Sequence, residues 1–129
     1  MDKVGVAMPF EVMLPAPGQG ALGVECRADD NDTCMLLKLL DDVSTRCAVE
    51  AERAFARALG GSCHSPLAAL ATVEHMETHL RAEILSIDGQ DRVRDQALFP
   101  LRDCDTGATP AKQMLALAPE SIRKLFQNA

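Results

Sequence analysis

A cysteine in a glycine-containing loop is the residue of this sequence whose surroundings best suit covalent chemistry. Cys63 follows Gly60 and Gly61 and precedes Pro66 within the stretch LGGSCHSP. Glycine adopts backbone dihedrals that a Cβ forbids, and proline fixes the direction in which the chain leaves the loop. The thiolate form of cysteine is a nucleophile, so the pattern predicts either an attachment point for an electrophilic carbon or an inert loop cysteine.

A second glycine-rich stretch lies upstream, with the sequence LPAPGQGALGVECR at residues 14–27. Its prolines stiffen the chain, and its glycines let the backbone approach another surface or a ligand closely. One interpretation of this stretch is therefore a close approach of the backbone to a ligand or another surface. The same pattern is equally typical of a hinge that feeds an ordinary buried strand, which we predict over residues 21–27.

Composition argues against nucleic acid and membrane partners. The net charge is −6, the basic residues are dispersed, and there is no Trp or Tyr to stack on bases. No apolar run approaches the roughly 20 residues of a membrane span, and the first residues lack the pattern of a secretory signal.

The five cysteines, at positions 26, 34, 47, 63 and 104, form an odd set without a C-x-x-C pair. This usage predicts free thiols in a reducing compartment, the cytoplasm or a plastid. His75 and His79 have the spacing of a helical metal site, but their neighbours are typical of strand and turn. No metal site is therefore expected.

The periodicity of the remaining chain predicts an α+β domain. A helix over about 33–41 is expected to be well buried, because its apolar residues cover more than one face. An amphipathic helix over 45–59 precedes the Cys63 loop, with Gly60 ending it. Three antiparallel strands are expected at 67–75, 79–87 and 91–99, with a tight turn at Asp88-Gly89. A helix starting at Thr109-Pro110 and a short last helix, with Ile122, Leu125 and Phe126 facing inward, complete the order.

Three motifs, in this order, resemble the porphobilinogen deaminase (hydroxymethylbilane synthase) family. They are LPAPGQGALGVECR, the run Glu52-Arg-Ala-Phe, and Gly61-Ser-Cys-His-Ser-Pro. The resemblance implies a C-terminal fragment of a three-domain enzyme. Residues 1–43 would be a hinge with a strand and helix of domain 1. Residues 44–129 would be the cofactor-attachment domain, a three-stranded antiparallel sheet with helices on one face.

The same resemblance implies the roles of individual residues. Cys63 would hold the dipyrromethane cofactor through a thioether, and the cofactor would prime the condensation of four porphobilinogen molecules. Gln19, Gly20 and Ala21 would lie beside the cofactor. Arg27 would either bind a substrate carboxylate or serve the strand structurally. The family's catalytic aspartate and most of its substrate-binding arginines belong to domains that this sequence largely lacks, so we expect the isolated chain to be inactive.

Two other interpretations stay open on the residues alone. One is a non-catalytic interaction or scaffold domain with an unmodified Cys63. The other is a thiol redox sensor, which needs a resolving cysteine that the sequence does not place nearby. The strand over 21–27 would lack its partners in this chain, so we also expect self-association through that edge.

Overall fold

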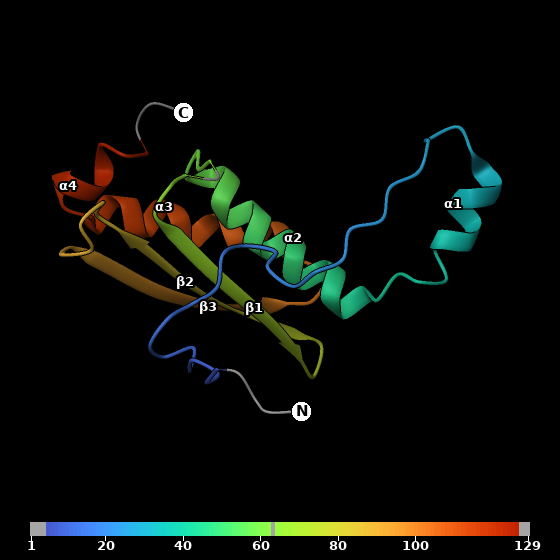
Figure 1. Cartoon of the computed structure of the whole chain (residues 1–129), viewed down its shortest axis with the longest axis horizontal. Coiled ribbons are helices and arrows are strands. Elements are labelled where there is room, and N and C mark those ends of the chain that lie inside the picture. The colour runs from blue at the N-terminus through green and yellow to red at the C-terminus, as the bar shows by residue number, and fades with distance from the viewer. Residues whose placement is uncertain (1–4, 63, 127–129) are drawn as a thin grey trace.

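The computed structural model describes residues 5–62 and 64–126 of the chain. A three-stranded antiparallel sheet lies at the centre (Figure 1), with its strands in the order β1 (Leu67–Glu74), β2 (Glu77–Leu85) and β3 (Arg92–Pro100). Helices α2 (Val43–Ala58) and α3 (Ala108–Leu117) cover one face of this sheet. The predicted α+β class and the predicted order of helix, three strands and helices are confirmed.

The hydrophobic core lies between the sheet and these two helices. Phe55 of α2, Leu80 of β2 and Met114 of α3 are each at most 1% exposed. In α2 the buried positions Ala51 and Phe55 are followed by Leu59, so one stripe of a helix with 3.6 residues per turn faces the sheet. The amphipathic pattern read from the sequence therefore identifies the buried face of α2.

A 3₁₀ turn, η1 (Cys104–Gly107), leads directly into α3 and lies close against α2. A Cβ placed on Gly107 would lie 2.3 Å from the carbonyl oxygen of Ala51, well inside van der Waals contact. Only glycine allows this approach. The short helix α4 (Glu120–Arg123) follows, and Ile122 and Phe126 are buried as predicted.

Side-chain caps fix where the helices begin. The carboxylate of Asp42 accepts a hydrogen bond from the Thr45 N–H at 2.7 Å at the start of α2. Asp30 accepts from the Thr33 N–H at 3.1 Å at the start of α1 (Asn31–Leu37). Both caps satisfy backbone donors that have no partner within the helix. At the other end of α2, Gly60 has φ +68°, as predicted for the residue that ends this helix.

Several boundaries differ from the sequence-based prediction. Helix α1 ends at Leu37 and not near residue 41, and β2 spans Glu77–Leu85 in place of 79–87, so residues 86–91 connect it to β3. The β1–β2 turn is a two-residue loop of His75 and Met76, both with positive φ, because Glu74 pairs with Glu77. Residues 75 and 76 carry no turn signal, since two-residue turns of this kind normally contain Asn-Gly. Helix α3 begins at Ala108, immediately after η1, and not at a Thr109 cap.

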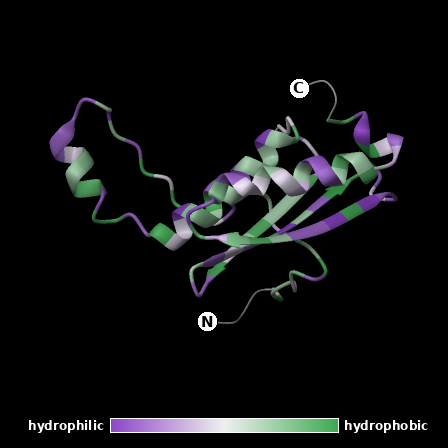
Figure 2. Cartoon of the chain, turned by 180° about the vertical axis from the view of Figure 1, so that it is seen from behind, coloured by the Kyte–Doolittle hydropathy of each residue, from purple (hydrophilic) through white to green (hydrophobic). Residues whose placement is uncertain are grey.

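Residues 20–40, which we call the arm, contain the clearest departure from prediction. The strand expected over 21–27 is absent, and α1 has no buried residue although deep burial was expected. Met35, Leu36, Leu39 and Leu40 are 61–81% exposed. Figure 2 shows the hydrophobic colour on α1 at a distance from the body of the domain. A strand needs a neighbour for its hydrogen bonds and a helix needs a surface for its apolar side chains, and the described chain supplies neither to the arm.

Among the helices of the described residues, none combines the length and the apolar content that crossing a bilayer would require.

Candidate functional site

The loop between α2 and β1 carries the predicted attachment cysteine. Cys63 itself lies outside the described residues, but the residues before it are closely packed. The Gly61 N–H donates to the Ala56 carbonyl at 3.0 Å, and a Cβ on Gly61 would lie 2.5 Å from Cδ2 of Leu67. A side chain at position 61 would therefore have to displace the end of the Leu67 side chain, at the first residue of β1.

Serine side chains order the loop on both sides of position 63. The Ser62 N–H donates to Oγ of Ser65 at 2.9 Å, and the Ser65 N–H donates to the Ser62 carbonyl at 3.0 Å. The His64 N–H donates to Oγ of Ser62 at 3.3 Å. Both Ser62 and His64 are exposed. The loop is thus hydrogen-bonded locally while its neighbouring side chains remain open to solvent.

The predicted hinge, residues 14–21, is attached to the same domain. The Ala69 N–H of β1 donates to the Pro15 carbonyl at 3.1 Å. Within the hinge, Oε1 of Gln19 accepts from the Ala16 N–H at 3.1 Å, so its amide oxygen turns back onto its own loop. Gly18 and Gly20 have φ of +74° and +86°, a region that favours glycine. The glycines therefore make the turn, and Gln19 supports it.

One buried carboxylate connects the hinge to the sheet. Oε2 of Glu52 accepts from the Gly18 N–H at 2.6 Å, and Oε1 accepts from the Ala71 N–H of β1 at 2.7 Å. We call this arrangement the Glu52 bridge. Glu52 is only 6% exposed. Burial raises the pKa of its carboxyl above the ordinary value, while the Ala71 and Gly18 N–H donors act in the opposite direction.

The sequence places Glu52 in one of the three motifs but assigns no role to it. A usable signal existed, because Glu52 lies three residues before Phe55 on a helix and therefore faces the core with it. A carboxylate at such a position needs hydrogen-bond donors. The sequence could not show that one donor would come from the hinge and the other from β1.

Two of the predicted binding residues line a groove of about 580 Å³ between the hinge, the arm and α2. Gly20 and Ala21 form one side, and Arg46 and Arg53 of α2 contribute cations. Nε of Arg46 is 3.0 Å from the Asp41 carboxylate and its Nη1 is 3.7 Å from that of Glu50. Guanidinium groups form bidentate contacts with carboxylates. The groove is also lined by the carboxylates of Asp41, Asp42 and Glu50, so an acidic ligand would compete with them for the guanidinium groups.

Arg27 lies apart from this groove. It is 82% exposed, and its guanidinium is 3.9 Å from the carboxylates of Asp29 and Asp30 at the start of α1. The structure therefore brings Gly20 and Ala21 together with the arginines of α2, and it does not bring Arg27 to the same place.

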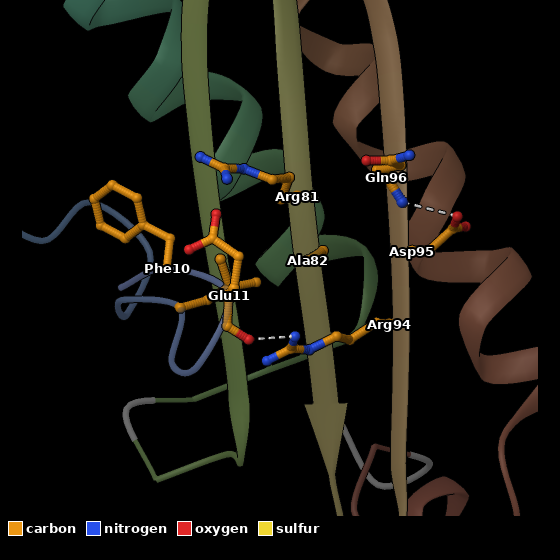
Figure 3. Close-up of a pocket in the computed structure, with 8 residues that line it drawn as sticks. Phe10, Glu11, Arg81, Ala82, Arg94, Asp95 and Gln96 are labelled. Atoms are coloured by element: carbon orange, nitrogen blue, oxygen red, sulfur yellow. Dashed lines mark hydrogen bonds between the residues drawn. The ribbon is translucent and has the colours of Figure 1, made fainter. Parts of the chain in front are cut away.

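The opposite face of the sheet carries a pocket of about 440 Å³ under the segment that precedes the hinge (Figure 3). Nη1 of Arg94 donates to the Glu11 carbonyl at 2.8 Å, and the same side chain forms an ion pair with Glu83. The guanidinium of Arg81 lies over the Phe10 ring at 5.5 Å. These contacts hold the preceding segment against the sheet, which leaves the hinge beside β1.

Comparison with known proteins places these features in a family. A family model described as "Porphobilinogen deaminase, C-terminal domain" matches residues 46–116, and "Porphobilinogen deaminase, dipyromethane cofactor binding domain" matches residues 1–35. The porphobilinogen deaminase of Sphingopyxis alaskensis is 44% identical over 98% of this chain. Those of Moorella thermoacetica and Brevibacillus brevis are 43% and 50% identical over 88% and 74% of it. The chain covers 40%, 36% and 31% of these relatives' lengths, respectively.

Proposed function

The chain belongs to the porphobilinogen deaminase family, and we propose that it forms the C-terminal part of a hydroxymethylbilane synthase that carries the cofactor thiol, Cys63. In this proposal residues 1–43 are the hinge and part of a preceding domain, and residues 44–129 are the cofactor-attachment domain. The substrate would be porphobilinogen, in the cytoplasm or a plastid. When bound, dipyrromethane supplies the primer for porphobilinogen condensation.

The Glu52 bridge is the structural observation that most supports this proposal. It holds the Gly18 backbone against β1, the strand that begins just after the Cys63 loop, and it does so from α2, the helix that ends just before that loop. The loop and the hinge are thereby anchored to the same two elements. A group attached at Cys63 would therefore have a fixed relation to the hinge, as an enzyme that builds a chain on a tethered primer requires.

The residues around the loop and hinge suit an acidic group tethered by a thioether. The exposed flanks Ser62 and His64 leave room for an attached group. Arg53 and the Gly20 N–H would bind carboxylates in the groove, whereas Arg46 is paired with Asp41 and the Ala21 N–H donates to the Gly18 carbonyl at 3.2 Å. Gln19 would act as a support for the hinge turn, through its hydrogen bond to Ala16.

Intact-mass spectrometry of the full-length protein tests the attachment. We expect one discrete adduct with the mass of dipyrromethane, retained in Cys104→Ser and in Cys26→Ser and lost in Cys63→Ser. Full-length protein without an adduct on Cys63 would instead support a non-catalytic interaction domain. Equal adducts on several cysteines would indicate indiscriminate thiol reactivity and would contradict the proposal.

Catalysis would need the part of the enzyme that this chain does not cover, since the chain spans about 40% of its first relative. We propose that the isolated chain consumes no porphobilinogen. The exposed apolar side chains of the arm would contact that remaining part or, in the isolated chain, a second copy. Sedimentation velocity of the isolated chain showing only monomer, with residues 14–30 protected from hydrogen exchange, would contradict the contact with a second copy.

A further inference from the structure

Two buried cysteines and one carboxylate converge at the contact between α2 and η1. Cys47 and Glu50 are three residues apart on α2, which places them on the same side of the helix. Cys104 is the first residue of η1. The two sulfur atoms and a carboxylate oxygen of Glu50 all lie within 4.8 Å of one another. Cys47 is 6% and Cys104 is 9% exposed, whereas Glu50 reaches solvent.

We propose that Cys47, Cys104 and Glu50 form a binding site for a thiophilic divalent cation, with Zn²⁺ as its biological occupant. Two sulfur ligands and one carboxylate oxygen, completed by a water molecule, make a four-coordinate set of the kind that zinc accepts. This site is separate from Cys63 and does not depend on the function proposed for that residue.

The spacing of the three groups fits such a cation after small side-chain movements. Ligand atoms on a tetrahedral zinc, with bonds of about 2.0–2.3 Å, lie about 3.3–3.8 Å apart. The described separations of up to 4.8 Å therefore have to shorten by about 1 Å. The exposed Glu50 side chain can supply most of this movement, because rotation about its χ angles shifts the carboxylate without disturbing the core.

The interactions that the cation would replace are weak. The Cys104 thiol donates to the Leu101 carbonyl at 3.2 Å. The Glu50 carboxylate is 3.7 Å from Nη1 of Arg46, and Arg46 keeps its closer contact with Asp41 at 3.0 Å. Exposed ion pairs of this kind contribute little to stability. Binding forms two metal–sulfur bonds and releases the two thiol protons to solvent, with no change of oxidation state.

The Glu50 carboxylate favours a divalent cation over a disulfide at this place. A divalent cation neutralises the negative charge that Glu50 and two thiolates would otherwise bring together, whereas a disulfide would leave the Glu50 charge in place.

The structural consequence would be a link between α2 and η1. These elements already approach closely at Gly107 and Ala51, and η1 leads directly into α3. A cation held by both elements would bind only the folded state, so it would stabilise the packed domain.

Titration with Co²⁺ of the full-length protein, with all its thiols reduced, tests the site. The starting variant is Cys26→Ser/Cys34→Ser, because the sulfur atoms of exposed Cys26 and half-buried Cys34 lie 3.4 Å apart and could bind metal themselves. We expect a thiolate-to-cobalt charge-transfer band that saturates at one equivalent of Co²⁺ and disappears when Zn²⁺ is added. Adding Cys63→Ser should leave this titration unchanged.

Loss of a ligand should weaken binding without unfolding the chain. In the starting variant, we expect Cys104→Ala to halve the charge-transfer intensity, and Glu50→Gln to weaken Co²⁺ binding by at least about tenfold. Glu120→Gln, at another exposed helical carboxylate, is the matched control and should bind normally. The proposal is wrong if the starting variant shows no charge-transfer band, or if Glu50→Gln and Cys104→Ala bind Co²⁺ as it does.

A thermal measurement covers the case in which Cys104→Ala fails to fold. Glu50 is on the surface, so Glu50→Gln should melt as the starting variant does when EDTA is present. Zn²⁺ should raise the melting temperature of the starting variant by several degrees and that of Glu50→Gln by clearly less. Equal increases in the two proteins would contradict the proposed site.

Discussion

Helices α1 and α2 both begin with an aspartate N-cap, but α1 is exposed to solvent and α2 is packed against the core. Each starts with an aspartate whose carboxylate accepts from the N–H three residues later, at 3.1 Å from Asp30 and 2.7 Å from Asp42. In α2 the apolar stripe is buried, whereas α1 has no buried residue. A cap determines where a helix starts, but burial requires a second surface. The packed domain supplies that surface from β1, β2 and α3, and nothing in the described chain supplies it to the arm.

Truncating one large side chain in the packed domain and one in the arm should give the largest difference in the free energy of unfolding. Phe55→Ala should lower the free energy of unfolding by about 3–5 kcal/mol, because it opens a cavity in the core. Leu39→Ala should change it by no more than about 0.5 kcal/mol, since Leu39 is 81% exposed. Urea denaturation of both variants measures the difference. Comparable losses in the two variants would mean that the arm packs on the domain in solution.

The Glu52 bridge joins the two regions, and its removal should have the next largest effect. Glu52→Ala leaves the Gly18 and Ala71 N–H groups without their acceptor, so we expect a loss of about 1–3 kcal/mol. Hydrogen exchange at both amides should also become faster. Glu50→Ala, at an exposed carboxylate on the same helix, is the matched control when chelator is present. If Glu50→Ala lost as much stability as Glu52→Ala, the two hydrogen bonds of the Glu52 bridge would not be the cause of the loss.

The same bridge should give the domain a distinctive pH dependence. The folded-state pKa of Glu52 lies above its ordinary value of 4.5, so the folded state holds this proton more tightly than the unfolded state. Its contribution to stability is therefore complete below that ordinary value and is lost as the pH rises through the raised value. Stability measured against pH should show this decrease in the parent but not in Glu52→Gln. An identical profile for both proteins would contradict the assignment.

The smallest effect is expected at the connections between β1 and β2 and between β2 and β3. His75 and Met76 both have positive φ, at +50° and +66°, a region that favours glycine and asparagine. Met76→Gly should stabilise the domain by about 0.5–1 kcal/mol. Gly89 has φ +70° in the turn between β2 and β3, so Gly89→Ala should have the opposite sign. If Met76→Gly and Gly89→Ala shifted the thermal unfolding temperature in the same direction, backbone strain in these turns would not control stability.

Much of the packed domain was predictable because its signals are local. The stripe of Ala51, Phe55 and Leu59, the Gly60 terminator and the Asp88-Gly89 turn each depend on neighbours within a few residues. The predictions failed where the signal depended on a partner. The alternation of residues predicts the strand over 21–27, and apolar content predicts the burial of α1, but neither signal shows whether a neighbouring strand or surface is present.

The sequence by itself determined the family and the order of the elements, because motifs and periodicity depend on residues that are close together along the chain. The role of Cys63 as the cofactor attachment point stays a prediction from the family resemblance. Only the tertiary structure decided what distant residues do together. It placed the Glu52 carboxylate between the hinge and β1, and it brought Cys104 to Cys47 and Glu50. The physical reason is that hydrogen bonds and metal ligands act over a few ångströms in space, whatever their separation along the chain.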